Sequence, residues 1–292
     1  MEIFAFSKTM NNQTLRYSTL FAAAAVLGAL LSAPLVRAQA QSQPGVDRIS
    51  VTLSDPTRPA VVKAGMVNGG ITVKAHDGKE VIVEARARNR DSSSDGNPKR
   101  IAISSTGLSV EEENNEVRIN TDSHMRTIDL TISVPAHTSV KLRAVNDGDI
   151  NVTGVDGELD IDDVNGSVNL NNISGSAVAH ALNGHLYATF VRVNQKPMAF
   201  SSLNGDIDVT FPAGLKANLN IRSDRGDVFS DFDVQLQATS AQPIVEDGRG
   251  NGGKYRVKID KGVHGTINGG GPEYQFTNFQ GKIYIRKAGA PR

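Results

Sequence analysis

Three acidic residues, Asp160, Asp162 and Asp163, have the spacing in this sequence that best suits metal chemistry. With two further acids nearby, Asp149 and Glu158, they could supply part of the roughly six to eight oxygen ligands that a calcium ion takes. The calcium-binding nonapeptide roll uses Gly-Gly-x-Gly-x-Asp turns, however, and only the first of those glycines is present here. Acidic side chains on the outer face of a strand are more often simply solvated. These aspartates are therefore weak calcium candidates, and no metal or other cofactor is expected.

Two short motifs resemble known binding sequences. The segment 248–254 (GRGNGGK) has the spacing of a phosphate-binding loop, but Tyr255 stands where the magnesium-binding Ser or Thr belongs, and no helical pattern follows. Arg225-Gly226-Asp227 is an RGD tripeptide, the sequence of a cell-adhesion ligand. The glycine repeat described below accounts for this glycine without any receptor. The first motif is expected to be a loop, and the second a part of the repeat.

Catalytic and zinc-binding arrangements are not indicated. His180 and His185 fall at different positions of adjacent repeats, and no cysteine accompanies them, so a zinc site is not expected. No G-x-S-x-G nucleophile elbow occurs. Paired carboxylates for glycoside cleavage remain open, because outward aspartates on neighbouring coils can approach each other. Such enzymes usually have an aromatic-lined groove, whereas this chain has no Trp and few aromatic residues. The protein is expected not to be an enzyme.

The elements that would position these residues come from a repeat. Five consecutive nonapeptides run from Gly148 to Arg192, and each begins with glycine. Counted from that glycine, positions +2, +4 and +7 are apolar in every copy, whereas +1, +3 and +5 are mostly polar. Alternation at +2 and +4 is typical of a β-strand with one buried face. The break before +7 predicts a corner that returns the chain to the core, and so short a period indicates a repeat architecture.

Two β arrangements fit this block. In an antiparallel meander, Asn165-Gly166 and Asn183-Gly184 would be tight hairpin turns. In a β-solenoid, two nonapeptides make one coil of 18 residues, and equivalent positions stack. The solenoid is favoured, because a hairpin strand would keep alternating up to its turn. The expected fold is therefore an all-β, single-stranded β-solenoid or β-helix-like stack. Its stacked pairs would be Asp160 on Val178, Asp162 on His180, Glu158 on Ser176, and an amide ladder of Asn151 on Asn169.

The glycines that open the repeats are expected to be structural. Asp, Asn or Ser followed by Gly accepts positive φ easily, which suits a tight corner. Beyond Arg192 the repeat loosens, and two further glycines open similar segments at intervals of 21 residues. The predicted turn glycines are Gly148, Gly157, Gly166, Gly175, Gly184, Gly205 and Gly226.

The N-terminal residues 1–40 resemble a secretory signal peptide. Arg16 provides a positive charge, residues 20–31 form a short apolar run, and small residues follow. Cleavage is expected after Ala38 or Ala40, and translation begins at Met1 or Met10. An uncleaved membrane anchor is the alternative, although the run is short for a bilayer span. No membrane span is expected once the signal is removed.

The remaining chain divides as follows. Residues 41–48 are expected to be a polar linker, and 49–287 a single β-solenoid domain with its regular repeats at 148–192. Residues 233–254 are expected to leave the stack as a loop excursion, and 288–292 to form a C-terminal tail. The last strand pattern, 281–287, is expected to be a C-terminal cap or the last rung of the stack.

Three segments together resemble a known family. They are MVNGGITVKAHDGKEVIVEA near the N-terminus, the nonapeptide block, and the closing INGGGPEYQFTNFQGKIYIRK. This glycine-phased strand pattern resembles the putative-adhesin family, a domain-of-unknown-function family of exported bacterial proteins with β-solenoid-like structure. The resemblance covers most of 49–287 and implies a non-enzymatic role outside the cytoplasm.

Composition and repeat together favour a binding protein. Lys+Arg and Asp+Glu are equal at 31 each, so no net charge attracts nucleic acid. The favoured function is an adhesin-like role, periplasmic or at the cell surface, in which flat polar faces contact an unidentified envelope or surface protein or glycan. Two alternatives stay open: a polysaccharide-acting parallel β-helix enzyme and a calcium-stabilised surface module.

Overall fold

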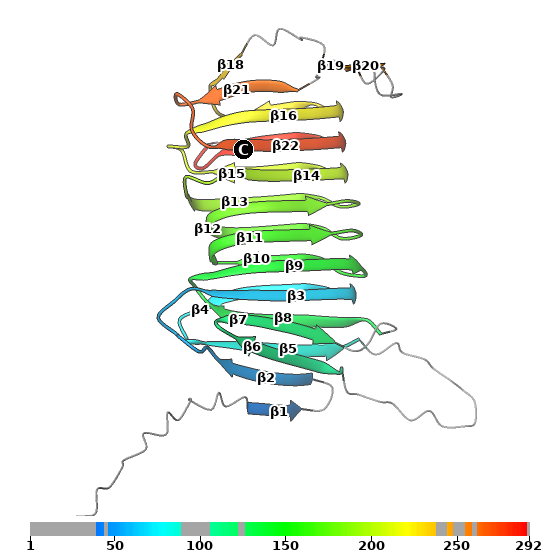
Figure 1. Cartoon of the computed structure of the whole chain (residues 1–292), viewed down its shortest axis with the longest axis vertical. Helices are drawn as coiled ribbons and strands as arrows, with labels where there is room; N and C mark the ends of the chain where they lie inside the picture. Colours follow the sequence, from blue (N-terminus) through cyan, green and yellow to red (C-terminus); the bar gives the residue numbers. More distant parts are fainter. Residues whose placement is uncertain are drawn as a thin grey trace, which may run out of the picture. The chain divides into compact units, whose positions relative to one another are not determined.

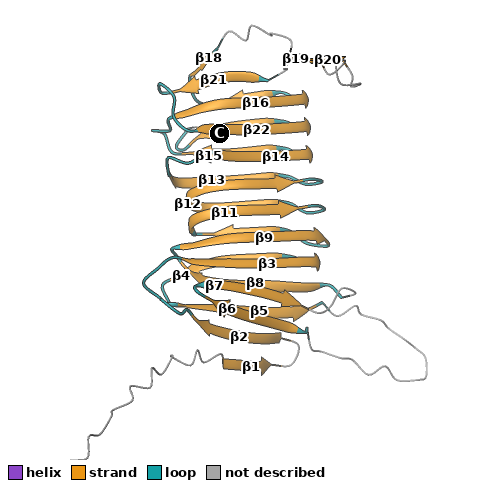
Figure 2. Cartoon of the chain, viewed as in Figure 1, coloured by secondary structure: helices purple, strands orange, loops and turns teal. Residues whose placement is uncertain are grey.

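The computed structural model describes residues 46–88, 106–121, 126–237 and 262–290, together with the backbone of three further strands, β1 (Gln39–Gln43), β19 (Ile244–Asp247) and β20 (Tyr255–Lys258). The chain separates into two units, 1–35 and 36–292, and every described residue belongs to the second. All regular elements of the described part are strands (Figure 2). The all-β class is thus confirmed, and no described element is a helix that could span a membrane. The expected signal peptide lies outside the described residues except for Gln39 and Ala40.

Two strand-built faces make up the stack (Figure 1). Because each coil contributes a strand to both faces, alternate strands of the chain fall on opposite faces, and β12 runs around a corner to join both. The first face contains β3 (Ala60–Asn68), β9 (Thr138–Asn146), β11 (Asp156–Asp163), the end of β12 (Val168–Ala181), β14 (Met198–Asn204), β22 (Glu273–Gln280) and β16 (Ala217–Arg225). The second contains β4 (Ile71–His76), β10 (Ile150–Thr153), the start of β12, β13 (Leu186–Val193), β15 (Ile207–Phe211), β23 (Ile283–Lys287) and β17 (Val228–Ser230).

The central strands pair in parallel with the spacing that the repeat predicts. Ile150 pairs with Val168 on one face, and Asp160 with Val178 on the other, an offset of 18 residues in both cases. The expected pairs Asp162–His180, Glu158–Ser176 and Asn151–Asn169 are confirmed. A meander of hairpins is wrong for this block, because neighbouring strands run in the same direction.

The core lies between the two faces and is filled by alternate side chains. All ten residues at positions +2 and +4 of the nonapeptides are buried. Each buried valine, leucine or isoleucine among them contributes roughly 1.5–3 kcal/mol, too little for one coil to be stable without neighbours on both sides. Towards the C-terminus the core becomes aromatic, with Phe190, Phe200, Phe211 and Phe276 in mutual ring contact.

The +7 position departs from the expectation of a uniform core. Val155 and Ile173 are buried, but Leu182 and Val191 are exposed and Val164 is half-buried. In the second, fourth and fifth repeats the strand continues to alternate, so the +6 residue enters the core instead: Asp163, Ala181 and Phe190 are all buried.

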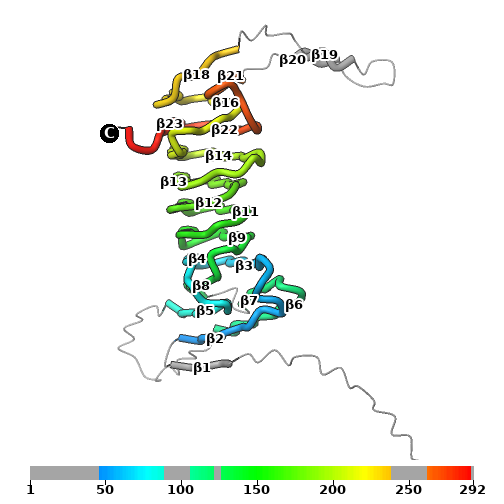
Figure 3. The backbone as a smooth tube through the Cα atoms, turned by 90° about the vertical axis from the view of Figure 1, so that its left-hand side faces the viewer, coloured from blue at the N-terminus to red at the C-terminus, as the bar shows by residue number. Residues whose placement is uncertain are grey.

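Coils do not follow sequence order at either end of the stack. The coil β22–β23 lies between β14–β15 and β16–β17, pairing in parallel with both neighbours (Figures 1 and 3). The expectation that 281–287 forms a cap or last rung is therefore wrong. Likewise β3–β4 lies between β9–β10 and the coil of β7 (Glu116–Thr121) and β8 (Ile128–Pro135). Segments distant in sequence thus close the core at both ends.

Antiparallel strands finish both ends. At the N-terminal end these are β5 (Glu80–Ala87), β2 (Val46–Thr52) and β1 behind β8, and β6 (Leu108–Glu113) beside β7. At the other end they are β21 (Val263–Ile267) and β18 (Val234–Leu236). Two expected boundaries change as a result. Residues 41–48 contribute to β1 and β2 rather than forming only a linker, and the excursion expected at 233–254 begins with a strand of the stack.

The repeat glycines are needed for close backbone approach more than for positive φ. A Cβ added to Gly184 would lie 2.0 Å from the carbonyl oxygen of Gly166, and one on Gly205 would lie 2.1 Å from that of Gly184. Among the seven predicted turn glycines only Gly175 has a positive φ, of 119°. The corners of successive coils are therefore packed too tightly for any side chain. Equivalent contacts within 2.4 Å of a backbone atom occur at Gly148, Gly157, Gly166, Gly175 and Gly226.

Candidate binding surface

The three calcium candidates do not converge. Asp160 and Asp162 point outward from β11, where Asp160 forms an ion pair with Lys141 at 2.5 Å. Asp163, one residue further, turns into the core with no exposed surface. Within the described part of the chain no three His, Cys, Asp or Glu side chains are placed to hold a metal ion. The alternation of a β-strand separates adjacent residues onto opposite faces, which a linear cluster conceals.

The histidine and RGD motifs take structural positions. His180 contacts Ser201 on the first face, whereas His185 Nδ1 accepts a hydrogen bond from the Asp206 N–H at 3.0 Å at a corner, so the two do not share a site. Gly226 of the RGD tripeptide packs against Gly281, and Arg225 lies over the Phe279 ring at 5.2 Å. The glycine-rich segment 248–254 lies outside the described residues.

A hollow of about 300 Å³ near the N-terminal end offers little for catalysis. Of its lining residues, His76 has both ring nitrogens engaged, with the Gly78 N–H at 3.0 Å and the Glu80 carbonyl at 2.9 Å. Arg58 pairs with Asp55 at 2.9 Å, and His137 with Asp156 at 3.1 Å. These polar groups bind other groups of the same chain and do not converge on a common point in the hollow.

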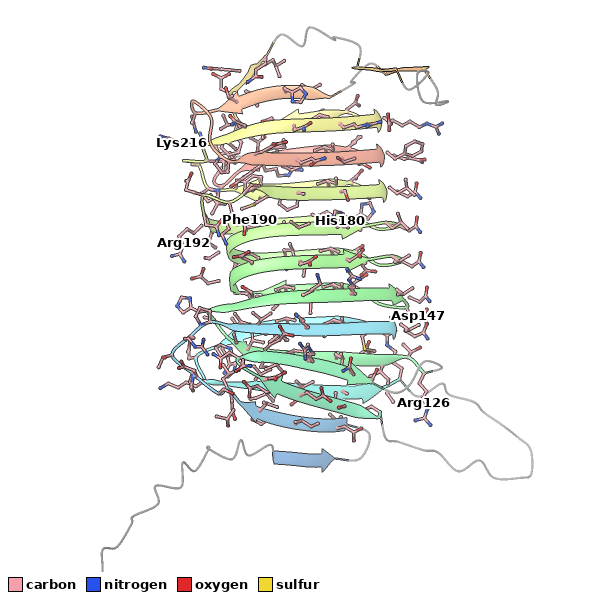
Figure 4. All side chains as sticks on the ribbon, in the orientation of Figure 1. Arg126, Asp147, His180, Phe190, Arg192 and Lys216 are labelled. Carbon is pink, nitrogen blue, oxygen red and sulfur yellow. The ribbon has the colours of Figure 1, made fainter. Side chains whose placement is uncertain are left out.

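A more distinctive feature follows one corner of the stack. Six coils each place an apolar residue and then an amide there, at the end of a first-face strand. We call this row the asparagine edge; Figure 4 shows the side chains along this side of the stack, where Asp147 is labelled. Its residue pairs are Val67-Asn68, Val145-Asn146, Val164-Asn165, Leu182-Asn183, Leu203-Asn204 and Phe279-Gln280.

The amides of the asparagine edge form a hydrogen-bonded ladder. Asn165 Nδ2 donates to Asn146 Oδ1 at 2.9 Å, and Asn183 Nδ2 donates to Asn165 Oδ1 at 3.0 Å. The same bond joins Asn204 to Asn183 at 2.8 Å and Asn146 to Asn68 at 3.4 Å. These bonds hold the side chains at the rung spacing of about 4.8 Å and keep this strip flat.

The apolar members of the edge are exposed. Of the twelve large hydrophobic residues that are exposed in the described part of the chain, five belong to this one column. Their exposed fractions range from 37% to 44%. The edge contains no charged residue over six rungs, a length of about 24 Å. Since contiguous exposed apolar surface marks interaction sites, this edge is the best candidate for one. Its exposed members are Val67, Val145, Leu182, Leu203 and Phe279.

One end of this edge is fixed by charge. Arg88 donates to both oxygens of Asp129, at 2.7 and 2.6 Å, and to the Asp147 carbonyl at 2.9 Å. Burial raises the pKa of Asp129, but the hydrogen bonds from Arg88 and from the Gly70 N–H outweigh this and leave the pKa below its ordinary value. The corner that precedes Gly148 is thus tied, through Arg88, to β8 and to the end of β5.

The sequence contained a signal for this edge that the nonapeptide alignment obscured. Aligning every nine residues groups Val164 and Leu182 with the buried Val155 and Ile173. An 18-residue alignment separates them, and it also places Asn165 above Asn183. The identity of the +6 residue then distinguishes the corners: Gly154 and Asn172, both with positive φ, turn +7 inward.

The fold and this surface define an all-β protein of stacked parallel coils with an apolar, amide-bordered edge. The chain belongs to the Toastrack DUF4097 family, whose model matches residues 68–268. No curated protein gives a significant match.

Two solved structures are similar in outline. One is a putative cell adhesion protein from Clostridium sporogenes, 10% identical, with a TM-score of 0.45, covering 84% of this chain and 100% of its own. The other is a putative adhesin from Bacteroides fragilis, 13% identical, with a TM-score of 0.39, covering 85% and 100%.

Proposed function

We propose that this chain is an exported, non-catalytic β-solenoid that binds an envelope or cell-surface partner through the asparagine edge. The observation that carries the proposal is the single column of apolar side chains over six coils, five of which are exposed. Exposed leucine, valine and phenylalanine at equivalent positions gain free energy only when another surface covers them. The flat polar faces, which the sequence analysis expected to make the contact, would then surround it and form its polar rim.

Two features support the non-catalytic part of the proposal. The acidic side chains that could serve a glycosidase are separated, since Asp163 is buried and Asp160 is paired with Lys141. The polar groups of the hollow near His76 are engaged with this chain. A partner recognised by a neutral edge of this kind would present an apolar strip of its own, on an envelope protein or on the less polar face of a glycan.

Export is proposed from residues 1–40, with the mature β-solenoid domain extending to about residue 287. Amino-terminal sequencing of protein recovered from a bacterial envelope fraction would test it. A start at Gln39 or Gln41 supports cleavage after Ala38 or Ala40. Recovery of the intact N-terminus in the cytoplasmic fraction would contradict export.

The binding proposal is tested with two matched lysine variants. Leu203→Lys places a charge on the asparagine edge, and Val178→Lys places one on the first face; the two residues are 40% and 39% exposed. The mature domain and both variants are immobilised and exposed to solubilised envelope extract, and bound protein and glycan are quantified. Leu203→Lys should reduce specific capture at least tenfold, and Val178→Lys should leave it unchanged. Equal capture by both variants would place the contact elsewhere.

A further inference from the structure

The side chain of Asp163 is the one described carboxyl group that is fully buried in the core. Neither of its oxygens has a hydrogen-bond partner of its own. It lies opposite two small residues, Ala144 on β9 and Ala181 on β12. An ionised carboxylate in this position would lose its hydration without compensation, which disfavours the charged form.

Ser202 and Asn278 occupy the same column, closer to the C-terminal end of the stack, and show how a polar side chain is accommodated there. Ser202 donates to the Gly184 carbonyl oxygen at 3.1 Å, and Asn278 Nδ2 donates to the Gly205 carbonyl oxygen at 2.9 Å. In both coils the acceptor belongs to a corner glycine of the adjoining second-face strand. Each bond ties the end of a first-face strand to the corner next to it. The column therefore selects side chains that donate a proton to a glycine carbonyl.

Asp163 lies in the same geometry as Asn278. At the Asn278 corner, a Cβ placed on Gly281 would be 2.2 Å from the Gly205 oxygen and 3.1 Å from Asn278 Nδ2. At the Asp163 corner, a Cβ placed on Gly166 would be 2.2 Å from the Gly148 oxygen and 2.8 Å from Asp163 Oδ2. The carboxyl oxygen thus occupies the position of an amide donor beside an equivalent carbonyl.

We propose that Asp163 is held as a neutral carboxylic acid whose hydroxyl donates to the carbonyl oxygen of Gly148. The corner between β11 and Gly166 is then a proton-dependent joint of the stack. Removing the proton places a carboxylate against a carbonyl oxygen, two acceptors with no hydrogen between them. The proposal concerns the stack itself and does not depend on the partner proposed above.

The surroundings favour the neutral form. Burial, followed by the negative charge of Asp149 and with a smaller effect from Asp162, raises the pKa of Asp163 to about 7. The N–H groups of Asn165 and Ile150 oppose this rise without closing a hydrogen bond. The charged groups that face Asp163 are thus both acidic, while β9 and β12 present alanines to it.

The direction of the pH effect follows from proton linkage. In the unfolded chain this carboxyl group has its ordinary pKa near 3.8, whereas in the folded chain the pKa is about 7. Between these values the folded state holds a proton that the unfolded state has released. Stability from Asp163 is therefore complete below pH 3.8 and is lost as pH rises to about 7. The unfolding constant should rise about tenfold per pH unit across that window.

The test compares the mature domain with Asp163→Asn, which supplies a permanent amide donor as Asn278 does, and with Asp162→Asn as the outward control. Unfolding constants are measured by urea titration from pH 4 to pH 8. The unfolding constant of the wild type divided by that of Asp163→Asn should rise about tenfold per pH unit up to about pH 7. The same ratio taken against Asp162→Asn should not change with pH. A flat ratio for Asp163→Asn would overturn the proposal.

Infrared spectroscopy of the unchanged protein gives a second, variant-free measurement. The C=O stretch of a protonated, buried carboxylic acid should be present at pH 5.5 and should disappear with a midpoint near pH 7. If Asp163→Asn folds, this band is missing from its spectrum and persists in Asp162→Asn. Absence of any protonated carboxyl band at pH 5.5 in the folded protein would refute the neutral acid, whatever the variants do.

Discussion

The two corners of the central coils are built from the same nonapeptide but differ in what they expose. At the asparagine edge the strand alternates to its end, so Asp163 and Ala181 point inward and Val164 and Leu182 outward. At the opposite corner, formed by residues 154–156 and 172–174, Gly154 and Asn172 take positive φ and turn Val155 and Ile173 into the core. A single backbone conformation at +6 thus decides whether the following apolar residue stabilises the core or forms a surface.

The fifth repeat, which begins at Gly184, shows that this choice depends on residue type. Its +6 residue is Phe190, which is too large and apolar for the left-handed region, so it enters the core and Val191 becomes exposed. The strand register shifts between Leu170–Ala188 and Ile173–Phe190 to accommodate it. Figure 4 places Phe190 within the stack and Arg192 at the rim of that corner.

The largest loss of stability is expected from adding a side chain to one of the closely packed corner glycines. Gly184→Ala would bring a Cβ to 2.0 Å from the Gly166 oxygen, where only backbone movement can relieve the clash. We expect a loss of about 3 kcal/mol or more in the free energy of unfolding. Urea denaturation checks it. Gly65→Ala, where a Cβ meets nothing within 4 Å, should change stability by less than about 0.5 kcal/mol.

The comparison between corners is tested directly by truncating one +7 residue of each kind. Ile173→Ala removes a fully buried side chain and should cost about 2–5 kcal/mol. Leu182→Ala removes one that is 44% exposed and should cost about 1 kcal/mol or less. Chemical denaturation of both variants under one condition gives the difference. Equal losses would mean that the two corners do not differ as described.

Much of this architecture was predictable from local residue types. Alternation at +2 and +4 gave the buried strands, and the 18-residue spacing gave the stacked pairs such as Asp160 with Val178. The inward orientation of Asp163 was also predictable from the sequence, since a strand that contains Asp160 and Asp162 on one face must place Asp163 on the other.

Long-range pairing was not predictable in the same way. Nothing in residues 273–287 indicates that they lie between β14–β15 and β16–β17, because those neighbours present similar apolar strands to any coil of the right length. The order of coils is set by packing between distant segments, here by Phe276 against Phe200 and Phe211. The asparagine edge required knowing both the 18-residue period and the conformation at +6.

A smaller effect is expected from the residue that sets the inward turn. Asn172 has a φ of 55°, a conformation that costs an ordinary L-residue about 1–2 kcal/mol and glycine almost nothing. Asn172→Ala should therefore destabilise by about 1 kcal/mol, while Asn172→Gly should be neutral within about 0.5 kcal/mol. Thermal unfolding of the pair measures this. A loss in the glycine variant as large as that in the alanine variant would assign the role to the amide side chain instead.

The smallest change in stability, and the most informative about function, is expected at the asparagine ladder. Asn183 donates to Asn165 and accepts from Asn204, both bonds at the exposed edge. Asn183→Ala should cost about 0.5–1 kcal/mol, because solvent replaces much of what is lost. Asn171→Ala, exposed at the opposite corner, is the matched control. If the edge is the contact surface, Asn183→Ala should weaken partner capture more than its stability loss accounts for, since Leu182 and Leu203 lose the rigid border that keeps them in line. Capture that falls equally in both alanine variants would show that the ladder serves the fold alone.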